Sequence, residues 1–263
     1  MTQTDYSEDQ AIGLAGQLAD SGRKDVISRL AEETIVPFGR IVVLGTDPDK
    51  QAKLPSLAAD ITDPLKVLGA TLHSHAGEAI KDELSGYKKE DSMSILHQGR
   101  LYMEAEQPMT AESQVWVRFA GKKQEQTLDW DADFVSGNTI DGKVNGAAIA
   151  SVPFNTDQAT TLADVATAIQ NAHHDVLSAS ATGARQITVV SVSDKNVLLS
   201  DFTVTGGASQ AVESIVETVA LVPESDRGKI RADADSSTAA LLENARVLKS
   251  ASAGGLAVLE LNL

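Results

Sequence analysis

Cysteine is absent from this 263-residue chain, and its absence excludes several kinds of structure and chemistry. Without a thiol there is no disulfide, no iron–sulfur cluster, no Cys₄ zinc site and no cysteine nucleophile. Stability must therefore come from apolar burial or from partners. Hydrophobic residues make up 42% of the chain, which is typical of a folded globular protein with a core of its own.

Aromatic and basic residues are also scarce. Aromatics account for 4% of the chain, so the core must be built from Ala, Val, Leu and Ile, and an aromatic-lined ligand pocket is disfavoured. Lys and Arg number 22 against 37 Asp and Glu, which gives a net charge of −15. A protein that binds nucleic acid needs clustered cations to neutralise phosphates, so we expect no nucleic-acid partner.

Long apolar runs are missing as well. No stretch approaches the roughly 18 apolar residues that a membrane-spanning helix needs, and we expect no membrane partner. Residues 1–10 are polar and acidic, without the basic start and apolar region of a signal peptide. We therefore expect no export by a signal peptide.

Motifs for catalysis and cofactor binding are absent from the sequence. It contains neither a Gly-x-Ser-x-Gly elbow nor a Gly-Lys-Ser/Thr phosphate loop, which predicts that the protein is not an enzyme and has no cofactor. His73 and His75 would project from one face of a strand and could share a metal with His97 or Glu78. We interpret them instead as hydrogen-bonded histidines beside a turn.

Two further groups of possible metal ligands are given structural interpretations. Asp129, Asp131 and Asp133 resemble half of a calcium loop, but residues 134–135 are Phe-Val where an EF-hand requires glycine. We interpret this stretch as a solvated acidic linker. Residues 173–175, His-His-Asp, are interpreted as the end of a helix. The sequence therefore predicts no metal site.

Short strands with turn signals between them dominate both ends of the chain. Alternating or continuous apolar residues predict strands at 40–44, 67–74, 92–96, 99–106, 114–119, 241–248 and 256–261. Residues 254–255, Gly-Gly, separate the last two and predict a hairpin. Strands at this spacing indicate a sandwich or a barrel.

The middle of the chain, residues 127–213, is richer in Thr, Ser, Ala and Gly and has a different pattern. The Asn145-Gly146 pair predicts a hairpin between strands at 139–144 and 147–154. A helix follows, with Leu162, Val165, Ala166 and Ile169 on one face, a capping box from Thr161 to Asp164, and an end near His173. Strands at 176–181, 186–192 and 200–205 complete a β-β-α-β-β-β unit.

These patterns predict a mainly β fold with an inserted α+β domain. The β domain is discontinuous, comprising residues 1–126 and 214–263, and begins with an extended arm at 1–22. The inserted domain comprises residues 127–213. Because insertions are tolerated at exposed loop tips, we expect the inserted domain to be attached at such a tip.

Short motifs in a fixed order give the chain a resemblance to a known family. They are GQLADSG at 16–22, SR at 28–29, IVPFG at 35–39, LGATLHSHA at 68–76, DSMSILHQGR at 91–100, GKIR at 228–231 and GGLAVLELNL at 254–263. Together they resemble the structural cement (decoration) proteins of tailed-bacteriophage capsids. The stretches VNGAAI at 144–149 and FNTD at 154–157 resemble a small α/β module that recurs as an insertion in phage virion proteins.

The resemblance implies a virion structural protein that binds the outer surface of the capsid and stabilises it by bridging major capsid subunits. It implies two partners, the major capsid protein and further copies of this chain, as a trimer or alternatively a dimer. The location implied is the outer capsid surface, with the host cytoplasm during assembly.

The arm and the last strand supply the candidate residues for contacts with the capsid or a neighbouring subunit. The arm combines apolar residues with mixed charges, and the last strand is apolar on both faces, so it must be buried in the sheet or against another subunit. The candidates are Leu14, Gln17, Leu18, Asp20, Arg23, Leu259 and Leu261. We expect deletion of residues 1–18 to abolish capsid binding and to leave the fold intact.

Two other functions remain open from the sequence. The domain at 127–213 could be a recognition module that binds a glycan or protein of the host surface, although its few aromatic residues argue against a sugar platform. The second alternative is a metal-dependent hydrolase that uses His73 and His75.

Overall fold

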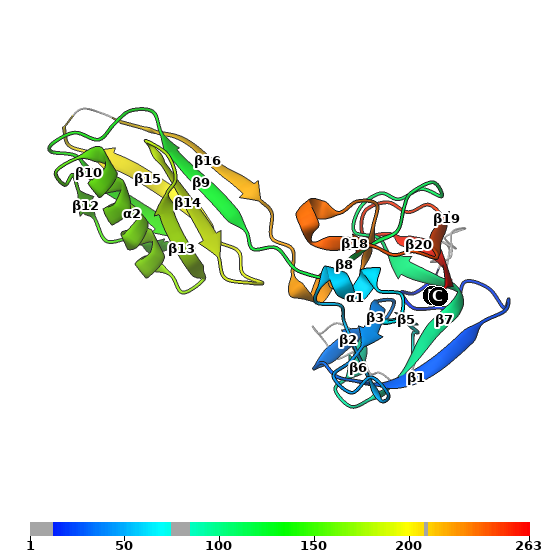
Figure 1. The fold of residues 1–263 in the computed structure, drawn as a ribbon. Coiled ribbons are helices and arrows are strands. Elements are labelled where there is room, and N and C mark those ends of the chain that lie inside the picture. Colours follow the sequence, from blue (N-terminus) through cyan, green and yellow to red (C-terminus); the bar gives the residue numbers. More distant parts are fainter. Residues whose placement is uncertain (1–12, 75–84, 208–209) are drawn as a thin grey trace, which may run out of the picture. The chain divides into compact units, whose positions relative to one another are not determined.

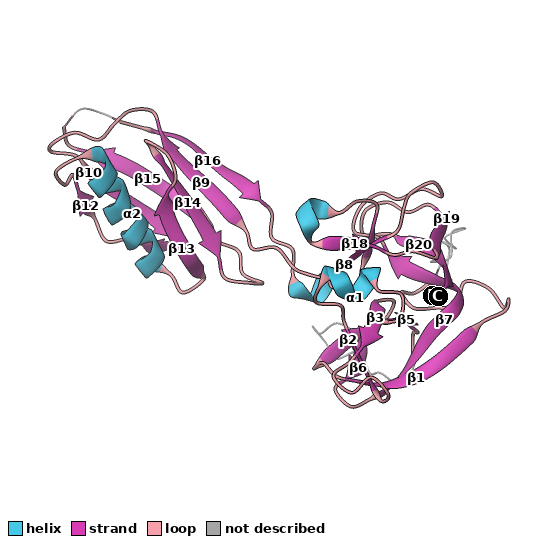
Figure 2. Cartoon of the chain, viewed as in Figure 1, coloured by secondary structure: helices cyan, strands magenta, loops and turns pink. Residues whose placement is uncertain are grey.

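The computed structural model describes residues 13–74, 85–207 and 210–263, and they form a mainly β protein (Figures 1 and 2). The chain divides into two compact units, one of residues 1–120 and 226–263 and the other of residues 121–225. We call them the barrel unit and the inserted unit. The boundaries predicted at 126/127 and 213/214 fall inside two strands of the inserted unit, β9 (Glu125–Trp130) and β16 (Val212–Val219).

A closed ring of five strands forms the barrel unit's centre. In ring order they are β1 (Asp25–Ala31), β4 (Gln51–Lys53), β3 (Ile41–Leu44), β5 (Val67–Thr71) and β7 (Ser92–Glu104), with β7 pairing back to β1. Val42 packs in one apolar cluster and its neighbours Ile41 and Val43 in another. Because successive side chains of a strand point to opposite faces, the first cluster fills the barrel and the second lies outside it.

Strand β7 is shared between the barrel and a second group of strands. Its first half pairs with β1 and β5, and its second half pairs with β20 (Leu256–Asn262). The sequence predicted two strands here, at 92–96 and 99–106, with a break at residues 97–98. Gly99 instead has φ 136°, a conformation that glycine adopts within one continuous 13-residue strand.

The C-terminal hairpin is confirmed. β19 (Ala245–Lys249) pairs antiparallel with β20, and Gly254 lies in the turn between them. The first strand of the hairpin begins later than predicted, because residues 239–241 form the separate strand β18 (Ala239–Leu241), which pairs with β8 (Trp116–Arg118). β17 (Ile230–Arg231) pairs with the other side of β8. The remaining elements of this unit are β2 (Ile35–Pro37), β6 (Gly86–Lys88), α1 (Ala58–Thr62) and a 3₁₀ turn at Asp235–Ser237.

A buried ion cluster fastens these short strands to the end of β7. Arg118 is 1% exposed and donates from Nε and Nη2 to the Glu106 carboxylate at 2.5 and 2.7 Å, and it also pairs with Asp235. Arg231 joins the same two carboxylates at 2.9 and 2.6 Å. The cluster therefore holds the segment that returns from the inserted unit against β7 and β8.

A second ion group lies at Glu104 on β7. Its carboxylate accepts hydrogen bonds from Lys229 Nζ at 2.8 Å and from Arg40 Nη1 at 3.3 Å. Burial by itself raises the pKa of Glu104, but the hydrogen bond from Lys229 and the charge of Arg40 outweigh it and hold the pKa below its ordinary value. Glu104 is therefore an ionised anchor for two buried cations.

The inserted unit has two groups of strands with an apolar core between them and the helix. One sheet has the order β13 (Val176–Ala181), β14 (Gln186–Ser191), β9 and β16. The other contains β10 (Thr139–Val144) with β11 (Ala147–Ala148), β12 (Val152–Pro153) and β15 (Leu199–Thr205). The helix α2 (Gln158–Ala172) buries Leu162, Val165, Ala166 and Ile169, the four positions predicted for its apolar face.

Local predictions for this unit are confirmed at the hairpin and are wrong at the start of the helix. Asn145 and Gly146 have φ values of 50° and 81°, as a type I′ turn requires. The helix is capped by Asp157, whose Oδ1 accepts the backbone N–H of Thr160 at 2.8 Å. Thr161, the predicted cap, is already inside the helix, where its hydroxyl donates to the Asp157 carbonyl oxygen at 2.8 Å.

The two chain segments that leave and re-enter the barrel unit are paired within each unit. In the inserted unit, Lys122 and Val222 exchange backbone hydrogen bonds of 2.9 Å. In the barrel unit, Gly228 donates to the Arg118 carbonyl oxygen at 2.8 Å, and Arg118 donates to that of Lys229 at 3.0 Å. In each unit, the two points at which the chain enters and leaves therefore lie close together. Among the described residues, no helix has the length and apolar character needed to cross a membrane.

Candidate functional site

The predicted arm lies alongside the second half of β7. Gly16 donates to the Tyr102 carbonyl oxygen at 2.8 Å, Tyr102 donates to that of Gln17 at 2.9 Å, and Ala19 donates to that of Arg100 at 3.0 Å. This is the hydrogen-bond pattern of an added antiparallel strand. Residues 16–19, the second half of β7, β20 and β19 thus form one continuous surface, which we call the arm sheet.

The inner face of the arm sheet belongs to the barrel unit's core. Leu259 and Leu261 of β20 are 0% and 1% exposed and pack in the apolar cluster outside the barrel, and Leu18 of the arm is partly buried against the same cluster. The interpretation of Leu259 and Leu261 as contacts for the capsid or a neighbour is therefore wrong, because their side chains are already covered by their own chain.

The outer face of the arm sheet carries the side chains that alternate with the buried ones. Tyr102 lies opposite Val258, and Arg100 lies opposite Glu260; all four are half-buried or more exposed. The sequence did not identify these residues, since an apolar strand leaves its two faces indistinguishable. The charged Glu260, two positions from Val258, was the available signal for the outward face.

Charged side chains form a row across this outer face. The Arg100 guanidinium contacts Asp20 of the arm and Glu260 of β20, both at 2.9 Å, and Arg246 of β19 donates to Glu260 at 2.5 Å. Hydrogen bonds to Glu260 and Asp20 raise the pKa of Arg100, and those from Arg100 and Arg246 lower the pKa of Glu260. Because the row is exposed, it orients the side chains and adds little to stability.

The remaining candidate contact residues lie along the arm. Leu14 is 53% exposed, and Gln17, Asp20 and Arg23 are also exposed. Asp20 and Arg23 line a hollow of about 400 Å³ together with Arg100 and Glu260. The structure thus places Asp20 and Arg23 beside the outer face of β7 and β20, whereas Leu14 and Gln17 lie beside Leu18, Leu72 and His73.

The histidine hypothesis is only partly addressed by the described residues. The ring of His73 lies 4.8 Å from that of Phe38, and His97 Nδ1 is 2.9 Å from the Leu68 carbonyl oxygen. His75 and Glu78 lie outside the described residues. His73 and His97 thus have ring and hydrogen-bond contacts of the ordinary kind.

The acidic stretch from Asp129 to Asp133, predicted as a solvated linker, is part of the folded inserted unit. Asp129 lies within β9 and accepts a hydrogen bond from Gln186 at 2.9 Å. Asp131 accepts from the Ala211 backbone at 2.9 Å, and Asp133 pairs with Arg185 at 3.3 Å. The linker interpretation is therefore wrong: the three carboxylates hold neighbouring segments of the inserted unit.

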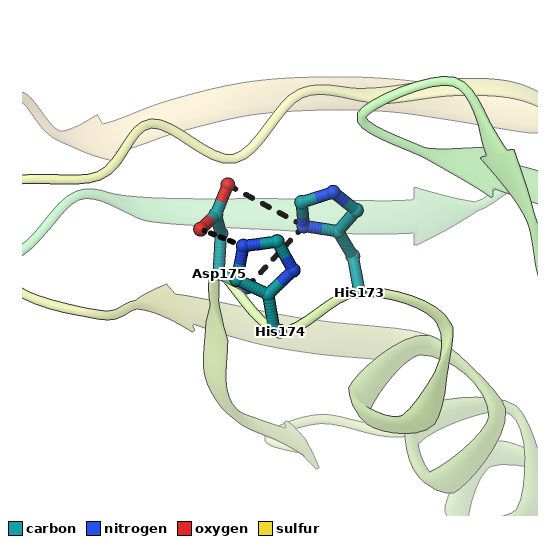
Figure 3. Close-up of side chains that lie close together, drawn as sticks. All are labelled: His173, His174 and Asp175. Atoms are coloured by element: carbon teal, nitrogen blue, oxygen red, sulfur yellow. Dashed lines mark hydrogen bonds and ion pairs between the residues drawn. The ribbon is translucent and has the colours of Figure 1, made fainter.

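His173, His174 and Asp175 follow α2, as the interpretation of a helix end predicted (Figure 3). Their donor atoms lie within 4.8 Å of one another, and the two imidazole rings stack at 4.4 Å. His173 Nδ1 accepts the Asp175 backbone N–H at 3.2 Å, and Asn145 Nδ2 donates to the Asp175 carboxylate at 3.1 Å. These contacts tie the helix end to the Asn145-Gly146 hairpin.

A groove of about 640 Å³ runs between α2 and the segment that contains β11 and β12. Its lining is mostly small side chains, with Phe154, Asn155, Asp164 and Asn171 as the larger ones. Asn155 Nδ2 donates to the Asp164 carboxylate at 3.0 Å, so the two polar groups at its edge partner each other. Phe154 is the one aromatic ring in the lining, which is little for a sugar platform.

The family model "structural cement protein (E217 gp24/Pam3 gp6)" matches residues 1–190. No curated protein matches. A solved structure from Mycobacterium phage Patience is similar over 90% of this chain and 90% of that chain, with 14% identity and a TM-score of 0.42.

The family match covers well over half of the chain, and the motif resemblance is thereby confirmed. It includes the arm, the five barrel strands and the inserted unit as far as β14. Members are structural proteins of phage capsids. The chain belongs to the phage structural cement protein family.

Proposed function

We propose that this protein binds the outer surface of the assembled capsid and bridges neighbouring major capsid subunits through the outer face of the arm sheet. Family membership supports a capsid-stabilising structural role. The location proposed is the outer capsid surface, reached during assembly in the host cytoplasm. Further copies of the chain, as a trimer or a dimer, are the second proposed partner.

The outer face of the arm sheet is the observation that carries the proposal. It presents Tyr102 and Val258 with the row from Asp20 to Arg246 along one side, and the exposed Leu14 belongs to the same arm as Asp20. An apolar centre with a polar rim is the usual anatomy of a protein–protein interface. The strands beneath it are fixed by their own core, so this face is held in shape before a partner binds.

The capsid is stabilised because the protein binds the assembled shell and not the separate capsid subunits. A ligand that binds one state of a target and not the other stabilises that state by RT ln(1 + [L]/Kd), which is about 2.7 kcal/mol at a hundredfold excess over Kd. A capsid offers many equivalent sites, and each bridge adds its own contribution. No chemical step is needed, which agrees with a structural and non-enzymatic role.

The test is a substitution on the exposed arm, because deletion of residues 1–18 would also remove backbone hydrogen bonds to β7 and the core contact of Leu18. Leu14→Asp places a charge on the proposed contact surface, and Leu65→Asp places one at another leucine of the barrel unit that is 84% exposed. Co-sedimentation with capsids and the capsid melting temperature are measured for both variants. We expect at least a tenfold loss of affinity for Leu14→Asp and unchanged binding for Leu65→Asp.

Two results would contradict the proposal. Equal affinity of the two variants would show that the arm sheet is not the contact surface. Saturable binding of the unmodified protein without any rise in the capsid melting temperature would show that the protein decorates the shell but does not bridge its subunits.

A further inference from the structure

We propose that the free edge of strand β13 in the inserted unit binds the same edge of a second copy of this chain, with the two strands antiparallel and Ser180 on the two-fold axis. β13 ends the order β13, β14, β9, β16 and, among the strands of the described residues, pairs with β14 alone (Figure 1). The inference concerns the self-association named in the proposed function and rests on that part of it alone.

The hydrogen-bond pattern shows which backbone groups of β13 point to the free edge. Thr182 donates to the Gln186 carbonyl oxygen at 3.0 Å, so these residues form a hydrogen-bonded pair. Such pairs recur at every second residue of an antiparallel ladder, which assigns Ser178 and Ser180 to bonds with β14. The N–H and C=O groups of Ala179 and Ala181 therefore point away from β14.

These outward groups define the register of the second strand. The carbonyl oxygen of Leu177, next along the edge, accepts a hydrogen bond from Gln170. Within the described part of the chain, no hydrogen bond reaches the outward groups of Ala179 and Ala181. Pairing Ala179 of one copy with Ala181 of the other satisfies all of them, and this register places Ser180 directly opposite Ser180 of the second copy.

Charge selects β13 over the other edge of the same sheet. Residues 176–184 contain no charged side chain, whereas β16 carries Glu213 and Glu217. Two copies joined at β16 would bring four carboxylates onto one ribbon in a chain whose net charge is already −15. Soluble proteins protect edge strands with charges or prolines, and β13 has neither.

Side-chain size also favours a close approach at β13. The residues nearest the axis are Ser178, Ala179, Ser180 and Ala181, and Ser180 and Ala181 are exposed. The side chains at the axis itself are therefore small. The contact is short, so we expect a weak dimer in solution that strengthens when a capsid holds many copies close together.

The cysteine-free chain permits a direct test by disulfide formation. Ser180→Cys introduces one thiol on the proposed axis, where paired strands bring Cα atoms within the 4.4–6.8 Å or so that a disulfide spans. Val216→Cys is the matched control, since Val216 is 50% exposed on the other edge strand of the sheet. Both full-length variants are oxidised under the same mild conditions, and covalent dimer is measured by non-reducing electrophoresis.

We expect at least five times more covalent dimer for Ser180→Cys than for Val216→Cys. A second variant, Ala181→Pro in the Ser180→Cys background, removes an outward N–H without removing a bond to β14, and we expect the excess dimer to be lost. Equal dimer yields for Ser180→Cys and Val216→Cys would overturn the inference. Because no capsid is present, this result is independent of the capsid-binding test.

Discussion

A single guanidinium group joins three segments of the barrel unit. Arg118 is 1% exposed and pairs with Glu106 at the end of β7 and with Asp235 in the segment that follows the inserted unit. A buried charge is stable only while its partners are present. At the scale of the residue, the integrity of this unit therefore depends on polar contacts as well as on its aliphatic core.

We predict that Arg118→Met lowers the free energy of unfolding of the barrel unit by about 3–5 kcal/mol, because it leaves Glu106 and Asp235 with one cation fewer. The chain has two tryptophans, Trp116 in the barrel unit and Trp130 in the inserted unit. Urea unfolding followed by Trp116 fluorescence in a Trp130→Phe background measures this unit alone. The control is Arg246→Met, whose exposed ion pair should matter little. Equal effects of the two substitutions would contradict the structural role of Arg118.

At the scale of the element, helix α2 depends on a cap that lies outside its apolar pattern. Asp157 accepts the Thr160 backbone N–H, and this hydrogen bond lowers the pKa of Asp157. The apolar face of the helix was readable from its spacing, whereas its first residue was not. Three Thr and two Asp residues stand between positions 156 and 164, and each is an acceptable cap by type.

We predict that Asp157→Ala lowers the melting temperature of the inserted unit, because an N–H of the first turn loses its acceptor. Asp157→Asn keeps an acceptor at the same place and should melt close to the unmodified protein. Trp130 fluorescence during heating, in a Trp116→Phe background, reports this unit. Equal melting of the Ala and Asn variants would show that the side chain does not cap α2.

Sequence reasoning succeeded at the elements whose signal is local. The Asn145-Gly146 turn and the spacing of Leu162 and Val165 determine a hairpin and a helix face without any knowledge of distant residues. It failed at residues 97–98, where a break was predicted, because pairing with the distant strands β1 and β20 carries β7 through without interruption. It also failed at Leu259 and Leu261, because the face of a two-sided apolar strand is decided by tertiary packing.

At the scale of the whole molecule, the inserted unit has an apolar core of its own and joins the barrel unit through two paired segments. Arg118 and Gly228 are hydrogen-bonded neighbours within the barrel unit, so its chain ends at the junction need only a short connection. Insertions with close ends are tolerated because they add little loop entropy to the host fold.

We predict that replacing residues 121–225 by a short Gly-Ser linker leaves the barrel unit folded. Trp116 fluorescence and urea unfolding should then match those of the barrel unit in the full chain, and capsid binding should persist if the arm sheet is the contact surface. An unfolded product would show that the barrel unit needs the inserted unit for stability. A folded product without capsid binding would instead place the contact on the inserted unit.

Strand β7 belongs both to the barrel and to the arm sheet, and this has a mechanical consequence. Its first half closes the barrel and its second half carries the arm sheet, so a pull on the proposed contact surface would be transmitted along one unbroken backbone into the barrel wall. Such a pull loads the hydrogen bonds to β1 and β20 in shear. Many of these bonds would therefore have to break together, and not one after another.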